Sequence, residues 1–106
     1  MSWLRLMPLA EVPRDRGVRV VTGSHRIALF RVGDDVFAIG DVCSHAEASL
    51  AEGEVFDYVV ECPRHGSEFD LRTGEPSSLP ATRPVPVYET RASNGDLYVY
   101  LEEDEE

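Results

Sequence analysis

Two short segments of the sequence each combine a thiol with an imidazole. In the first, Cys43 and His45 are separated by one residue. In the second, Cys62 and His65 are separated by two, and 16 residues lie between the two segments. Thiolates and imidazoles bind zinc and iron, and both groups of one segment can meet at one metal centre if the chain turns between them. Gly66 favours such a turn, so the four residues are candidate metal ligands.

Two other interpretations of these residues stay open on spacing alone. Cys43 and Cys62 are the only cysteines, so a single disulfide between them is formally possible. The sequence shows no export signal, and in a reducing compartment cysteines with nearby histidines more often bind metal. The donors also fit a structural Cys₂His₂ zinc site, although zinc-binding segments usually begin with two cysteines two to four residues apart. A zinc site would make the chain a non-redox interaction module.

Short runs of β-type residues, separated by turn signals, surround these segments. They predict an all-β protein with an antiparallel sandwich or barrel, because such spacing is typical of successive hairpins. Helix is expected only as single turns at residues 9–12 and 46–51. The expected strands are residues 18–21, 27–32, 36–39, 85–90 and 97–101, with turns at residues 22–24, 33–35 and 93–96.

The region from residue 41 to residue 83 has a different composition. It holds both candidate metal-binding segments and three of the seven prolines, and strand character is confined to residues 55–61 and 68–71. A loop-rich insert of this kind buries little apolar surface and needs another source of order, which a metal centre provides. We therefore expect one domain over residues 1–101, with a β base at 1–40 and 84–101 and a cluster-binding insert at 41–83.

Together, the two segments resemble the paired motif of the Rieske family, C-x-H followed by C-P-x-H-G-S. The resemblance implies a Rieske-like antiparallel β fold that holds a [2Fe–2S] cluster. It further implies that Cys43 and Cys62 bind one iron while His45 and His65 bind the other. Residues 74–80 resemble the proline loop that covers the cluster in that family.

The same resemblance places Ser67, Phe69 and Pro80 around the cluster. Two thiolates and two neutral imidazoles make the oxidised cluster neutral, and such centres have potentials of roughly −150 to +300 mV. High-potential members carry two further cysteines and a tyrosine where this sequence has Ala48, Arg64 and Phe69. Ser67 remains as a donor to a bridging sulfide. We therefore expect a potential in the lower part of that range.

The family resemblance implies a one-electron carrier and not an enzyme. Its expected partners are an NAD(P)H-dependent flavoprotein reductase and a terminal oxygenase such as an aromatic-ring dioxygenase. Iron–sulfur cluster assembly, another reductase, or permanent membership of an enzyme complex are alternatives. If His45 and His65 bind the cluster, His25 is the only histidine left. The mononuclear iron site of an oxygenase needs two histidines and a carboxylate, so this chain cannot supply it. His25 itself is expected to be exposed in a turn.

Charge and hydropathy exclude two further kinds of partner. The formal net charge is −10, and residues 102–106 form an acidic tail that supplies half of it. The chain has ten arginines and no lysine, which disfavours binding to nucleic acid. No stretch of about 18 apolar residues suggests a membrane span. We expect a cytoplasmic monomer.

Overall fold

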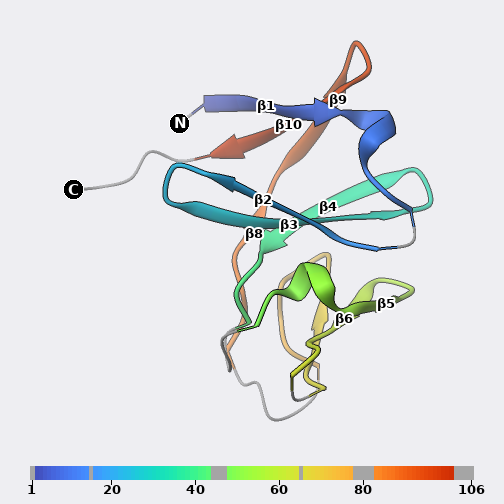
Figure 1. The fold of residues 1–106 in the computed structure, drawn as a ribbon, viewed down its shortest axis with the longest axis vertical. Helices are drawn as coiled ribbons and strands as arrows, with labels where there is room; N and C mark the ends of the chain where they lie inside the picture. Colours follow the sequence, from blue (N-terminus) through green and yellow to red (C-terminus); the bar gives the residue numbers. More distant parts are fainter. Residues whose placement is uncertain (1, 15, 44–47, 65, 78–82, 102–106) are drawn as a thin grey trace.

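A computed structural model describes residues 2–14, 16–43, 48–64, 66–77 and 83–101 of the chain. These residues form three antiparallel sheets stacked along the long axis of the molecule (Figure 1), which confirms the predicted all-β fold class. The upper sheet has the order β1-β10-β9, the middle sheet β2-β3-β4-β8 and the lower sheet β5-β6-β7. The strands are β1 Ser2–Pro8, β2 Val18–Thr22, β3 His25–Val32, β4 Asp35–Gly40, β5 Glu54–Phe56, β6 Val59–Glu61, β7 Glu68–Asp70, β8 Val87–Tyr88, β9 Thr90–Ser93 and β10 Asp96–Leu101.

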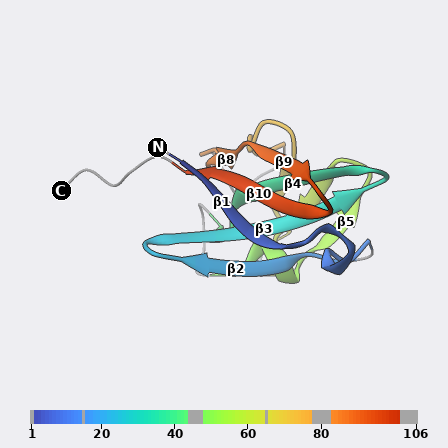
Figure 2. The ribbon, with the colours of Figure 1, turned by 90° about the horizontal axis from the view of Figure 1, so that it is seen from above.

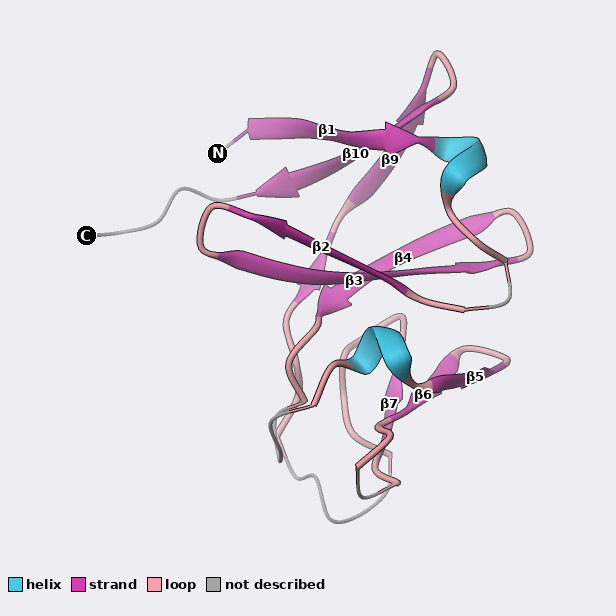
Figure 3. Ribbon diagram, in the orientation of Figure 1, coloured by secondary structure: helices cyan, strands magenta, loops and turns pink. Residues whose placement is uncertain are grey.

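Helical structure in the described residues is limited to two 3₁₀ turns, η1 Leu9–Glu11 and η2 Leu50–Glu52 (Figure 3). Single turns were expected at residues 9–12 and 46–51, and η1 lies inside the first of these ranges. Of the second range, residues 46 and 47 lie outside the described chain, and η2 begins near its end. Among the described residues, no helix is long and apolar enough to cross a membrane.

The centre of β3 is buried on both faces, which explains why its sequence is a nearly continuous apolar run. Ile27 and Leu29 pack into a core shared with the upper sheet. Ala28 and Phe30, which point the opposite way, pack into a second core shared with the lower sheet. Seen from above, β1 and β10 run across the middle sheet (Figure 2). The middle sheet therefore separates the two cores.

The hairpins follow the predicted turn signals. Gly23 and Gly33 adopt positive φ angles of 58° and 62° between β2, β3 and β4, where an L side chain would be disfavoured. Asn94 and Gly95 also have positive φ and connect β9 to β10. The three predicted turns are therefore confirmed.

Two predicted strands are each divided in the structure. Residues 55–61 form the hairpin of β5 and β6, because Asp57 takes a φ of 55° and reverses the chain. Residues 85–90 pass from one sheet to another: Tyr88 in β8 pairs with Ala38 of β4, whereas Thr90 in β9 pairs with Val99 of β10. A local apolar run does not reveal such a change of partner.

The prediction for His25 is wrong. His25 is the first residue of β3 and is half-buried, not an exposed turn residue. Its ring packs edge-on against Tyr88, with ring centroids 5.8 Å apart. The two-residue turn at Gly23 and Ser24 is tighter than the sequence suggested, so pairing begins with Thr22 and His25.

Candidate metal centre

The first candidate segment lies in a narrow loop that follows β4. The Leu50 N–H donates to the Asp41 carbonyl over 2.7 Å, and Val42 and Ser49 form an isolated bridge between the two arms of the loop. The Cys43 N–H then donates to the Ala48 carbonyl over 3.0 Å. These bonds fix the backbone of Cys43 beside Ala48. His45 lies outside the described residues.

The Asp41 side chain holds the base of this loop. Its Oδ1 accepts hydrogen bonds from the Ser49 hydroxyl at 2.7 Å and from the Ala51 N–H at 3.1 Å. Asp41 is only 1% exposed, and its Oδ2 has no hydrogen-bond partner among the described residues. Burial of a carboxylate is costly unless its hydrogen bonds compensate, so its place here indicates a structural role. The sequence analysis missed this residue, although an acidic residue directly after the apolar end of β4 was a signal.

The second segment closes the hairpin of β6 and β7. The Cys62 N–H donates to the Ser67 carbonyl over 2.7 Å, and the Gly66 N–H donates to the Cys62 carbonyl over 3.0 Å. Gly66 has a φ of 79°, which the tight return requires and which glycine adopts without a Cβ penalty. Cys62 is thereby fixed at the end of β6. His65 lies outside the described residues.

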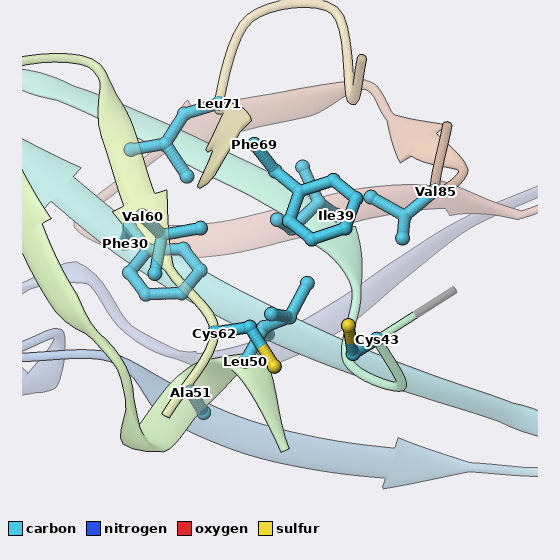
Figure 4. Close-up of a cluster of buried hydrophobic side chains, with 11 residues drawn as sticks. Phe30, Ile39, Cys43, Leu50, Ala51, Val60, Cys62, Phe69, Leu71 and Val85 are labelled. Carbon is cyan, nitrogen blue, oxygen red and sulfur yellow. The ribbon is translucent and has the colours of Figure 1, made fainter. Parts of the chain in front are cut away.

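The two cysteines belong to one buried cluster of side chains (Figure 4). Cys43 is 4% and Cys62 1% exposed, and no disulfide joins them. Within the described residues, no group of three or more metal-binding side chains forms, because both candidate histidines fall outside this part of the chain. Two buried thiols, each two or three positions before a histidine in the sequence, are a donor set that fits a [2Fe–2S] cluster with mixed ligands.

The predicted surroundings of the centre are partly visible. Phe69 is fully buried in the same cluster as both cysteines, opposite Val60 of β6. Ser67 is also fully buried beside Cys62. Whether its hydroxyl donates to a sulfide stays a prediction. Pro80 lies outside the described residues.

The expected covering loop is closed at its base by backbone contacts. The Val85 N–H donates to the Gly74 carbonyl over 2.8 Å, and the Gly74 N–H donates to the Asp70 carbonyl over 2.7 Å. Gly74 has a φ of 77°, and a Cβ placed there would lie 2.2 Å from the Val85 carbonyl oxygen. The close approach of the two backbones therefore requires glycine at this position.

Charged and aromatic contacts support the insert from outside. The Arg72 guanidinium lowers the pKa of Asp70, to which it donates over 3.1 Å, although partial burial opposes this shift. Arg72 also lies over the Tyr58 ring at 4.8 Å, and Tyr58 packs edge-on against Phe37 of β4. In the base, burial raises the pKa of Tyr88. The contacts of Arg72 and Tyr58 connect the lower sheet to β4. The thiols themselves lie among apolar side chains.

An all-β base that presents two thiol-bearing loops beside a shared buried core defines a small metal-binding protein. The chain belongs to the Rieske [2Fe–2S] domain family, because the sequence model of that family matches residues 2–89. It therefore carries a [2Fe–2S] cluster, and the zinc alternative is wrong. The protein is an electron-transfer component and not itself the catalytic enzyme.

Known proteins of similar sequence and structure support this class. The anthranilate 1,2-dioxygenase ferredoxin subunit of Burkholderia cepacia is 44% identical over 98 residues, which cover 92% of this chain and 91% of that protein. The ferredoxin of carbazole 1,9a-dioxygenase from Nocardioides aromaticivorans IC177 has a TM-score of 0.91 at 31% identity, over 96% of this chain and 100% of that one. A third similar structure is a chain in a complex of reduced oxygenase and oxidised ferredoxin of carbazole 1,9a-dioxygenase. It has a TM-score of 0.88 at 38% identity, and the match covers 98% of this chain and 97% of that one.

Proposed function

We propose that Cys43, His45, Cys62 and His65 hold the cluster, with the cysteines on one iron and the histidines on the other. The observation that carries this assignment is the position of the two thiols, which no disulfide joins and which are buried in one cluster of side chains beside two backbone-bonded turns. When bound, the cluster accepts and releases one electron. The residues of the insert, which we propose spans 41–83, hold the two loops in register and exclude water from the thiol side.

We further propose that the protein carries electrons from an NAD(P)H-dependent flavoprotein reductase to a terminal oxygenase. The relatives named as ferredoxin subunits of dioxygenases support this role, as does the similar chain in a complex with an oxygenase. Because Phe69 supplies no hydroxyl to a cysteine sulfur, the proposed potential lies in the lower part of the Rieske range. A cytoplasmic monomer suits such a shuttle. An acceptor in another pathway remains the alternative prediction.

Reconstitution tests the carrier role. The holoprotein replaces the ferredoxin in an assay with the purified reductase and oxygenase components of the anthranilate 1,2-dioxygenase system. We expect anthranilate-dependent NADH oxidation that rises with the concentration of the added protein. If the cluster is reduced by dithionite and reoxidised by air but exchanges electrons with neither component, the oxygenase assignment is contradicted.

A variant tests the ligand assignment. His65→Ala removes one nitrogen donor, so we expect loss of the intact cluster, seen as loss of the visible absorption and of the electron paramagnetic resonance signal of the reduced protein. His25→Ala is the matched control, because His25 lies in β3, and it should retain both signals. A normal spectrum in the His65→Ala variant would remove His65 from the ligand set.

A further inference from the structure

A groove of about 610 Å³ lies on the surface beside the two cysteine loops. Val42 and Pro63, which line it, are the chain neighbours of Cys43 and Cys62. Three arginines from separate segments also line it: Arg19 from β2, Arg26 from β3 and Arg64 from the second loop. The groove is therefore adjacent to the proposed cluster and rich in guanidinium groups.

The arginines of this groove differ from the other seven in the chain. Each of those seven has a partner: Arg5 with Asp96, Arg72 with Asp70, Arg14 with the Gly33 carbonyl, Arg31 with the Leu9 carbonyl and Arg91 with the Trp3 ring, while Arg16 and Arg83 also make contacts. The side chains of Arg19, Arg26 and Arg64 make no ion pair, hydrogen bond or cation–π contact with another described residue. All three arginines without such a partner thus face one groove.

The register of the middle sheet brings two of these arginines to one face. Arg19 pairs with Ala28 and Val21 pairs with Arg26, so all four side chains point to the same side of β2 and β3. Ala28 on that side belongs to the core shared with the insert. The two guanidinium groups therefore extend toward the edge of the insert, where Arg64 approaches them from the second loop.

The surface of the groove is also partly apolar. Val42, which lines it, is 40% exposed, and Val21, which lies outside the lining but pairs with Arg26, is 61% exposed. Two carboxylates, Asp41 and Glu52, line the groove as well, but the Asp41 side chain is buried under the first loop. Three cations against two carboxylates leave a formal charge of +1 on a chain whose net charge is −10. The local sign is thus opposite to that of the molecule.

We propose that this groove is a docking site for an acidic segment of the protein that exchanges electrons with the cluster. Unpaired guanidinium groups bind carboxylates through parallel N–H donors. Exposed valines and Pro63 beside them suit a protein surface, since a free inorganic anion gains nothing from apolar contact. Its place beside both cysteine loops brings a bound partner close to the proposed centre. The inference rests on the carrier function and specifies which kind of surface the partner presents.

Peptide binding tests the groove directly. A short peptide of alternating glutamate and alanine is titrated into the holoprotein at low ionic strength, with the lysine–alanine peptide as the control of opposite sign. We expect the acidic peptide to bind and to weaken as salt is added, because exposed charge pairs are screened. Arg19→Gln, Arg26→Gln or Arg64→Gln should each weaken binding by about two- to fivefold, and the triple variant by about tenfold or more.

The matched control is Arg91→Gln, which removes the same charge from the upper sheet and should leave peptide binding unchanged. The proposal is overturned if the acidic peptide binds no better than the basic one, or if Arg91→Gln weakens binding as much as the groove variants do. All variants should keep the cluster spectrum of the wild type, because the three groove side chains touch no other described polar group.

Electron transfer separates this inference from the carrier function. In the reconstituted assay, the triple variant should show a lower rate at low salt. The midpoint potential, measured on the same variant, separates weaker docking from a change in driving force. If the triple variant transfers electrons at the wild-type rate, the docking proposal is overturned while the carrier function is left intact. If the wild type transfers no electrons but the acidic peptide still binds through the three arginines, the carrier function fails, and the groove stands only as a binding site for acidic peptides.

Discussion

At the scale of single residues, Asp41 connects the fold to the centre most directly. Its Oδ1 receives a hydroxyl and an amide from the far arm of the loop that begins at Cys43. A buried acceptor with two donors stabilises the loop, and removing it leaves both donors, Ser49 Oγ and Ala51 N, without their partner. The loop then keeps its backbone bonds but loses the side-chain bonds that hold its base, two residues before Cys43.

Replacing Asp41 with alanine should therefore destabilise the protein by about 1–3 kcal/mol, the cost of leaving buried partners unsatisfied. The cluster should also be lost sooner on heating. Thermal unfolding followed by circular dichroism and by the visible absorption of the cluster measures both effects. Asp41→Asn keeps an acceptor oxygen and should be milder.

Asp34→Ala removes an exposed carboxylate from the turn between β3 and β4 and serves as the control, with little expected change. Equal stability and cluster retention in the Asp41→Ala and Asp34→Ala variants would show that the Asp41 carboxylate does not hold the loop.

Phe69 permits a second test at this scale. The side chain is fully buried in the cluster that contains both cysteines, so Phe69→Tyr introduces a hydroxyl beside the centre. If that hydroxyl donates to a cysteine sulfur, it stabilises the reduced state more than the oxidised one. A difference of about 1 kcal/mol corresponds to roughly 40 mV, so the midpoint potential should rise by about that amount.

Voltammetry of the holoprotein measures the shift in the Phe69→Tyr variant. Phe56→Tyr makes the same change at a side chain in β5 that is 51% exposed, and the potential should stay constant there. A fall in potential, or an equal shift in both variants, would argue against a hydroxyl–sulfur bond.

At the scale of elements, short-range signals and long-range pairing differ in how well the sequence reveals them. Glycines at Gly23 and Gly33 predicted their turns, because positive φ is a local requirement. The passage of residues 85–90 between two sheets depends on where β4 and β10 lie, which no local pattern contains. The length of the turn before His25 likewise depends on pairing, since it is set by where β2 and β3 begin to pair, at Thr22 and His25. The paired motif singled out two cysteines that the structure buries in one cluster, and their role as ligands stays a prediction. The hydrogen bonds of the Asp41 side chain depend on the loop geometry, which the sequence analysis did not predict.

The base of the covering loop offers a test at this scale. Gly74→Ala adds a Cβ that would lie 2.2 Å from the Val85 carbonyl oxygen, at a φ of 77°. Backbone must move on one side or the other, so we expect a loss of about 1–3 kcal/mol or more, with faster loss of the cluster. Chemical denaturation followed by fluorescence and by visible absorption gives both values.

Gly33→Ala is the matched control, since Gly33 has a similar φ of 62° but nothing within 4 Å of its added Cβ. That variant should show the cost of the backbone angle alone. If both variants lose the same stability, the close approach of Gly74 and Val85 contributes nothing.

At the scale of the whole molecule, the two cores differ in their relation to the metal centre. The core between the upper and middle sheets contains no cysteine, whereas the core under the insert contains both. Strands of the lower sheet have only three residues each, which is short for independent stability. Order in the insert should therefore depend on the cluster more than order in the base does.

Removing the iron with a chelator under reducing conditions tests this division. Hydrogen exchange should then become fast for the amides of β5, β6 and β7, while those of β3, β4 and β10 stay protected. The holoprotein under the same conditions, without the chelator, is the reference. Uniform loss of protection through all three sheets would show that the base has no stability of its own.

The central claim is that two sulfur and two nitrogen donors hold one cluster. Electron–nuclear double resonance of the dithionite-reduced protein, grown with ¹⁵N-labelled histidine, tests it most directly, together with iron and acid-labile sulfide analysis. We predict nitrogen couplings from two imidazoles on one iron, with iron and sulfide in equal amounts. Absence of histidine nitrogen coupling, or of labile sulfide, would contradict the account.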